Sequence, residues 1–164
     1  MESQRIESEK RRFYDLERRA QEYLNELYKD IGAIIVSRNG NTKRDLVVSV
    51  NGKELKIEEK IRNASVSGIQ DIAIEILQDM STTGAYGWFY TEEFDYLVYA
   101  WCKDTGEPIK VLSIDWEKFK AWFLNWLCEK KHVAALVSCK GWGKTINILV
   151  PIKSIPRNLY KELV

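Results

Sequence analysis

The chain has 164 residues, of which 45% are hydrophobic and 30% are charged, and its formal net charge is +1. This length and composition predict a single folded domain over residues 1–164 and exclude a disordered chain. The near-neutral charge argues against a protein that binds nucleic acid over its whole surface, although it allows a basic face beside an acidic site.

The predicted elements begin with an amphipathic helix over residues 3–29, where apolar side chains recur every three or four residues. Two turn signals, Asn39-Gly40 and Asn51-Gly52, separate the short apolar runs that follow the helix. The predicted strands in this part of the chain cover residues 33–37, 45–50, 54–62 and 71–77. The first half of the sequence therefore predicts a helix followed by a β-meander.

The second half of the sequence continues with strands at 95–101 and 109–114, and Asp115 then provides an N-cap for a helix over 116–130. Further strands are predicted at 133–139 and 145–152, and a short terminal helix is expected after Pro156. This order predicts an α+β fold, or a mixed α/β fold, in which a helix and the later strands complete a central mixed sheet.

Three charged side chains converge in the predicted hairpin around Asn51-Gly52. If this pair forms a two-residue type I′ turn, Asp45 lies directly opposite Glu58, and the alternation of a strand places Lys60 on the same face. Two adjacent carboxylates favour a divalent cation, and hard oxygen ligands select Mg²⁺ or Mn²⁺ over zinc. A metal ion beside a lysine suits the hydrolysis of phosphodiester bonds.

A simpler interpretation is that these three side chains form an ion pair on a solvated sheet face, worth less than ~1 kcal/mol. Glu59 would face Arg44 in the same register, and we expect this second pair to lie at the surface or edge. The hairpin alone leaves both interpretations open.

Other acidic residues are candidates for the same site. Glu75 alternates with the isoleucines of the strand 71–77 and could serve as an additional metal-ligating acid, or could simply point outward from a half-buried strand. Glu22 and Glu26 on the first helix are further candidates.

The spacing from Asp45 to Glu58-Glu59-Lys60 resembles the D…(D/E)xK signature of the PD-(D/E)XK nuclease superfamily, whose core is a helix, a meander, a helix and a strand. The segments "DIAIEIL", "GWFYTEEFDYLVYAW" and "VSCKGWGKTINILVPI" are similar to phage and mobile-element proteins of this superfamily, so the resemblance touches most of residues 20–155. Arg44 stands at the name-giving proline position, which varies widely in the superfamily.

The resemblance implies a Mg²⁺- or Mn²⁺-dependent nuclease that acts on DNA, in DNA processing, recombination or defence against foreign DNA. By the same resemblance Asp45 and Glu58 would hold the metal, Lys60 would be the catalytic lysine, and a homodimer would be compatible with this class. The backbone carbonyl of Ile57 or of Glu59 would be a further metal ligand. Two alternatives stay open: a non-catalytic nucleic-acid-binding or protein-interaction module on this fold, and an unrelated α+β interaction domain.

The segment "SCKGWGKT" ends like a phosphate-binding P-loop, but Ser138 occupies the position of its first glycine and a strand follows where a helix is required. A hairpin turn is therefore expected. Lys140, Trp142 and Lys144 on this turn could contact a nucleic-acid backbone and stack on a base, or could belong to an ordinary exposed loop.

The cellular compartment is predicted from two kinds of pattern that the sequence lacks. The three cysteines lack the spacing of a zinc site or a disulfide framework, which is typical of reduced thiols. The charged N-terminal segment lacks a signal-peptide pattern, and no stretch approaches the ~18 apolar residues of a membrane span. We therefore expect a cytoplasmic protein without membrane association.

Overall fold

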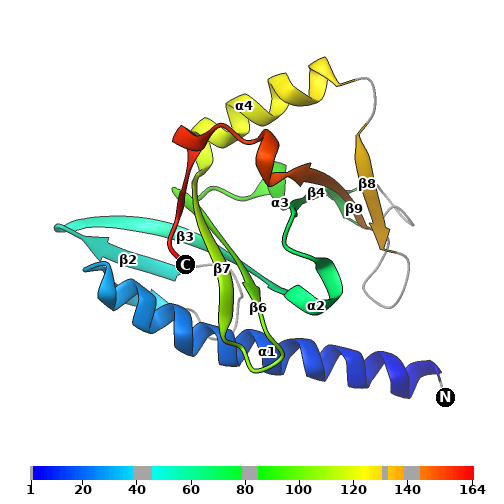
Figure 1. Cartoon of the computed structure of the whole chain (residues 1–164), viewed down its shortest axis with the longest axis horizontal. Coiled ribbons are helices and arrows are strands. Elements are labelled where there is room, and N and C mark those ends of the chain that lie inside the picture. Colours follow the sequence, from blue (N-terminus) through cyan, green and yellow to red (C-terminus); the bar gives the residue numbers. More distant parts are fainter. Residues whose placement is uncertain (1, 39–45, 79–84, 131–132, 139–144) are drawn as a thin grey trace. The chain divides into compact units, whose positions relative to one another are not determined.

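The computed structural model describes residues 2–38, 46–78, 85–130, 133–138 and 145–164. Helices combine with a six-stranded mixed sheet and a second, four-stranded sheet, which confirms the predicted α+β class (Figure 1). The chain divides into two compact units, the first formed by residues 1–69, 94–116 and 158–164 and the second by 70–93 and 117–157. The single domain over residues 1–164 stays a prediction.

The first unit begins with α1, Glu2–Asp30, which confirms the predicted amphipathic helix. Its buried stripe repeats every four residues, at Leu16, Ala20, Leu24 and Tyr28. Gly32 follows the end of the helix, and its φ of 79° is a backbone conformation that favours glycine. The amide of the next residue donates to the carbonyl of Tyr28 at 2.8 Å, so the last turn is capped where the chain turns into the sheet.

The sheet of the first unit follows the order β1-β2-β3-β6-β7-β10. Its neighbouring strands are antiparallel except β3 and β6, which are parallel. The bounds are β1 Ile34–Arg38, β2 Leu46–Val50, β3 Lys53–Asn63, β6 Tyr96–Cys102, β7 Pro108–Asp115 and β10 Tyr160–Glu162. The short helix α2, Ala64–Ser67, directly follows β3.

The β2–β3 hairpin has the predicted register, with Leu46 opposite Ile57 and Val50 opposite Lys53. Asn51 and Gly52 have φ values of 51° and 78°, as a type I′ turn requires. The two-residue turn therefore fixes which residues of β3 share a face.

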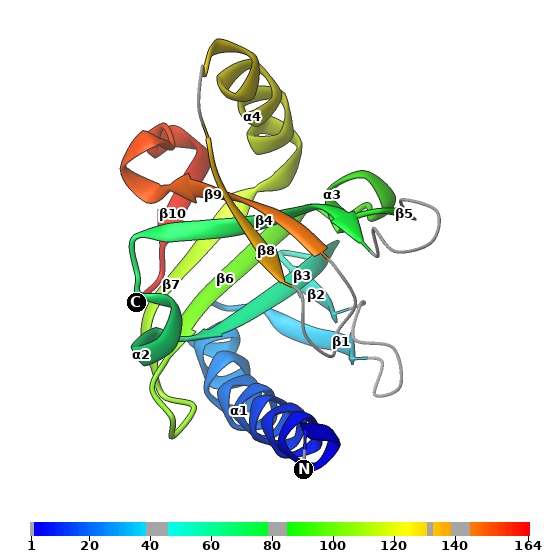
Figure 2. The same cartoon turned by 90° about the vertical axis from the view of Figure 1, so that its right-hand side faces the viewer.

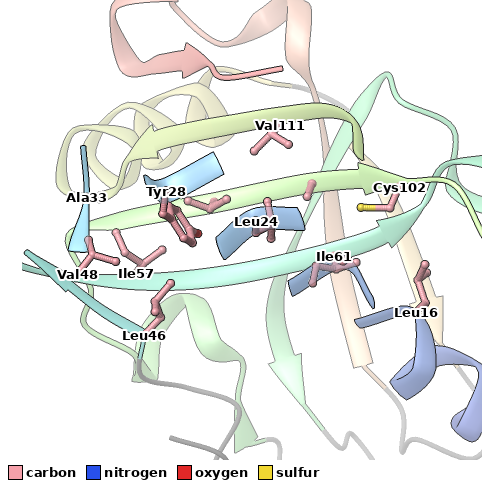
Figure 3. Packing of buried hydrophobic residues seen from close by; sticks show 13 residues of the cluster. Leu16, Leu24, Tyr28, Ala33, Leu46, Val48, Ile57, Ile61, Cys102 and Val111 are labelled. Carbon is pink, nitrogen blue, oxygen red and sulfur yellow. The ribbon is translucent and has the colours of Figure 1, made fainter. Parts of the chain in front are cut away.

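The main hydrophobic core of the first unit lies between α1 and one face of this sheet (Figure 3). Leu24 of the helix is fully buried there, as is Ala100 of β6, and Ile57 and Ile61 of β3 belong to the same cluster. Burying a leucine side chain of this kind contributes about 2 kcal/mol. The odd-numbered residues of β3 thus pack towards α1, and the even-numbered residues face the other way.

The second unit contains the order β5-β4-β9-β8, in which all neighbours are antiparallel (Figure 2). The bounds are β4 Asp71–Gln78, β5 Ala85–Tyr86, β8 Ala134–Ser138 and β9 Thr145–Pro151, with the short helix α3 at Trp88–Thr91 and a 3₁₀ turn at Ile152–Ser154. Helix α4, Trp116–Glu129, contributes all but its first residue to this unit, and its buried Phe123 contacts Phe89 with ring centroids 5.0 Å apart. Phe119 of the same helix is also buried, so its aromatic side chains form part of a core.

Two local predictions differ from the structure. The strands predicted at 71–77, 133–139 and 145–152 do not join the central mixed sheet, because β4, β8 and β9 form the separate four-stranded sheet with β5. The expected terminal helix is only a 3₁₀ turn, Arg157–Leu159, and β10 then pairs with β7. Hydrogen bonds between Val111 and the last two residues extend this pairing, so contacts with a distant strand override the local helical pattern.

Within the part of the chain that the structure describes, no helix is long and apolar enough to cross a membrane.

Candidate functional site

Glu58 and Lys60 lie on the face of β3 that points away from the α1 core, as the alternation predicted. The Glu58 side chain is only 3% exposed and that of Lys60 is 21% exposed. The Lys60 ammonium donates a hydrogen bond to a carboxylate oxygen of Glu58. A buried carboxylate and a lysine are therefore in direct contact at the predicted position.

The remaining predicted site residues lie outside the described residues, on the second unit or on α1. Asp45 lies outside the described residues, so its position opposite Glu58 stays a prediction that extends the observed register of β2 and β3. Glu75 lies on β4 of the second unit and is partly buried. The predicted nucleic-acid contacts also lie outside the described residues: Lys140, Trp142 and Lys144.

The acidic candidates on the first helix have a different environment. Glu22 is exposed, and Glu26 is exposed and accepts a hydrogen bond from Lys29 of the same helix at 2.6 Å. Among the described residues, no three His, Cys, Asp or Glu side chains form a group that could hold a metal ion. The described part of the predicted site thus contains one buried carboxylate, that of Glu58.

The P-loop interpretation, which the sequence rejected, also lacks its helix in the structure. Residues 145–151 form strand β9, where a phosphate-binding loop would require the start of a helix.

The neighbours of Glu58 and Lys60 on β6 are mostly large and buried. In the parallel register, Glu58 pairs with Leu97, Lys60 with Tyr99 and Arg62 with Trp101. Arg62 donates from Nε to the Tyr99 hydroxyl at 3.1 Å, and its guanidinium carbon lies 5.9 Å from the centre of that ring. The sequence pattern gave no signal for this contact, because it depends on the parallel pairing of β3 with β6.

The opposite face of β3 carries a second charged network, centred on Glu59. Arg38 of β1 donates to both carboxylate oxygens of Glu59, at 2.5 and 3.1 Å, and also to the side-chain oxygen of Asn25 at 2.8 Å. The Tyr28 hydroxyl donates to the same carboxylate at 2.8 Å. Because the Glu59 side chain is only 7% exposed, the expectation that it forms a surface pair was wrong.

The electrostatics of this network follow from burial and from the Glu59 charge. Burial, and then the charge and hydrogen bond of Glu59, raise the pKa of Tyr28 well above its usual value. Burial works against the charge of Arg38, but the hydrogen bond and the charge of Glu59 outweigh it and raise the pKa of the guanidinium. The network therefore joins α1, β1 and β3 through the Arg38–Glu59 pair and the Tyr28 hydroxyl.

Asp95 fixes the start of β6 against β3. Its carboxylate accepts a hydrogen bond from the backbone amide of Lys56 at 2.8 Å, and its own amide donates to the Lys56 carbonyl at 2.9 Å. Its carbonyl also accepts from the amide of Trp116 at 3.1 Å. Asp95 thus sets the register that places Tyr99 beside Lys60.

In the second unit, the backbone around Glu75 requires a glycine as its neighbour. The pairing of β4 with β9 shifts between Glu75 and Leu77, as in a β-bulge. Gly87 donates to the carbonyl of Ile76 at 3.0 Å, and a Cβ at Gly87 would lie 2.3 Å from the carbonyl oxygen of Glu75. Only glycine permits this close approach.

Comparison with known proteins finds no matching family model, no matching curated protein and no matching solved structure. What the fold and the described site define is thus an α+β protein with a buried Glu58–Lys60 pair.

Proposed function

We propose that this protein is a metal-dependent nuclease that hydrolyses phosphodiester bonds in DNA, in DNA processing, recombination or defence against foreign DNA. The observation that supports the proposal is the direct contact of Lys60 with a Glu58 carboxylate that is almost fully buried. An ordinary ion pair on a solvated sheet face would leave both groups in water. Taking a carboxylate out of water costs several kcal/mol, so its retention beside a lysine is more typical of a site than of a solubilising surface.

The residues fit a hard divalent cation by the chemistry of their donor atoms. Glu58 and, by the predicted register, Asp45 would provide carboxylate oxygens, which favour Mg²⁺ or Mn²⁺. When bound, such an ion supplies stabilisation of the negative charge on the phosphate. Glu75 as an additional acid, and Lys140, Trp142 and Lys144 as DNA contacts, are part of the same proposal.

Lys60 would act through its ammonium group. The group donates hydrogen bonds and carries a positive charge, so it would orient the attacking water or stabilise the charge that develops on the phosphate oxygens. Its contact with Glu58 keeps the ammonium next to the carboxylate that would hold the ion. The pair would thus place the positive charge where the reaction needs it.

The experiment is cleavage of plasmid and branched DNA by the purified protein with Mg²⁺ or Mn²⁺, with EDTA as a parallel control. Lys60→Ala and Glu58→Gln are expected to lower the cleavage rate by about a hundredfold or more. Lys53→Ala is the matched control, because Lys53 lies on the same strand but on the other face and is exposed. Circular dichroism should show that all variants are folded.

Equal cleavage rates for Lys60→Ala and Lys53→Ala would contradict the proposed role of Lys60. A folded protein that cuts neither substrate with either metal, yet binds DNA or a protein, would favour the non-catalytic module instead. A homodimer is compatible with either outcome, and light scattering would measure the oligomeric state.

A further inference from the structure

Strand β1 forms an open edge of the six-stranded sheet. The strand order begins at β1, which pairs with β2 on one side (Figure 2). Among the described residues, no strand pairs with the other side of β1. Alternate residues of an edge strand direct their amide and carbonyl groups away from the neighbouring strand. The outer side of β1 therefore presents main-chain donors and acceptors that fit another strand.

Large aliphatic side chains are exposed along this edge. The exposed fraction is 51% for Ile31, 70% for Ile34 and 50% for Val36. Ile35 packs against the core under α1, so its neighbour Ile34 points to the other face of the sheet. Single exposed apolar residues are ordinary, but several beside an open strand edge are typical of an interaction site.

The segment 31–37 also lacks the charges that usually protect an edge strand. Its sequence, "IGAIIVS", contains no charged residue and no proline, in a chain of which 30% is charged. Natural sheets protect their edges with charged side chains, prolines, bulges or very short strands. The pairing of β1 with β2 does shift between Ile35 and Ser37, as in a bulge, which shortens the regular part of the edge. We therefore expect this edge to form a short and weak contact.

The opposite edge of the same sheet is protected in two of these ways. Strand β10 has only three residues, Tyr160–Glu162, and both Lys161 and Glu162 are exposed. This contrast makes β1 the edge that fits a further strand. It also disfavours pairing of β1 with β10 of another copy, which would extend into an open filament.

We propose that β1 pairs antiparallel with β1 of a second copy of this chain and forms a two-fold symmetric dimer. In such a pair each open edge covers the other, so the assembly stops at two chains. A neutral apolar strand is complementary to itself, because no like charges face each other and the exposed aliphatic side chains of both copies leave water. This inference goes beyond the proposed nuclease function and does not depend on it.

The test is sedimentation equilibrium of the full chain at about 1–500 µM, because small interfaces are typical of weak complexes. The mass should rise with concentration from 19.2 kDa towards twice that value. Ile34→Lys and Val36→Lys place a like charge on both copies, and each should weaken the dimer about tenfold or more. Ile69→Lys is the matched control and should leave the dimer unchanged, because Ile69 is 40% exposed but lies outside the strands.

A mixture of two variants tests the symmetry of the contact. A two-fold axis through the centre of the five-residue strand passes closest to its middle residue, Val36. Val36→Lys mixed with Val36→Glu would bring opposite charges together, so the mixture should associate about tenfold more strongly than either variant alone at low salt. Circular dichroism should show that both variants are folded.

The proposal is overturned if the unaltered protein stays monomeric over the whole concentration range, which would leave the β1 edge to a strand of a different protein. Equal weakening by Ile69→Lys and Ile34→Lys would also overturn it, because the effect would then be one of charge alone. A mixture that associates no better than its separate components would refute the two-fold pairing. The cleavage assay bears on none of these outcomes, because sedimentation is measured without DNA.

Discussion

The Arg38–Glu59 pair predicts a large loss of stability when one partner is removed. Arg38→Met deletes three hydrogen bonds, two to Glu59 and one to Asn25, and leaves the Glu59 carboxylate with the Tyr28 hydroxyl. Hydrogen bonds to charged groups are worth about 1.5–3 kcal/mol each. Breaking a fully buried pair costs about 3–5 kcal/mol. Because the Arg38 side chain is 24% exposed, we expect the free energy of unfolding to fall by about 2–4 kcal/mol.

The assay is urea unfolding followed by circular dichroism at neutral pH, for Arg38→Met, Glu59→Leu and the double variant. The double variant should be less destabilised than the sum of the single variants, because it no longer buries an unpaired charge. The matched control is Arg18→Met on α1, where the side chains of Arg18 and Asp15 are 75% and 58% exposed at 4.0 Å separation. That variant should change the unfolding free energy by about 0.5 kcal/mol or less.

One result would refute this reasoning. If Arg38→Met costs less than about 1 kcal/mol with an unchanged m-value, and so behaves like the surface pair, the Glu59 carboxylate is solvated. The packing of α1 over that part of the sheet would then be looser than the buried network requires.

Three further predictions concern pH, backbone conformation and thiol reactivity. Because the pKa of Tyr28 is raised, the native protein keeps a proton that the unfolded chain releases above about pH 10, and the free energy of unfolding should fall as the pH rises further. Urea unfolding should show a weaker fall for Tyr28→Phe. Gly106→Ala should lower the free energy of unfolding by about 1–3 kcal/mol, because the φ of Gly106 is 91° and a Cβ would lie 2.5 Å from a side-chain carbon of Arg19 on α1. Gly52→Ala should show a smaller loss of stability in thermal unfolding, because a Cβ there would meet open space. Burial raises the pKa of Cys102 to about 11. In a Cys139→Ser variant at about pH 8, iodoacetamide should therefore label the exposed Cys128 in the folded protein and Cys102 only after unfolding. A Gly52→Ala loss as large as that of Gly106→Ala, or rapid labelling of Cys102 in the folded protein, would contradict the corresponding reasoning.

The elements that the sequence predicted well are those whose signals are local. The helical period over residues 3–29 and the Asn51-Gly52 turn each describe an interaction within a short stretch of chain, and both predictions were confirmed. The turn also fixed the register of β2 and β3, because a two-residue hairpin leaves no freedom in pairing.

The pairing of strands distant in sequence could not be predicted in this way. An apolar run such as 71–77 predicts a strand but does not contain the identity of its partners, which depend on packing across the whole unit. The same holds for Tyr160–Glu162, where a helical pattern gives way to pairing with β7.

For the candidate site too, the local features were predictable from the sequence and the long-range contacts were not. By itself, the sequence determined that Glu58 and Lys60 share a face of β3, because side chains alternate strictly along a strand. Only the tertiary structure decided that Glu58 is buried, that Tyr99 orients Arg62, and that Glu59 faces Arg38. Burial and partner choice depend on which elements pack against β3, and the residues that do so are brought there by the parallel β6 and by α1, more than twenty residues away in the chain.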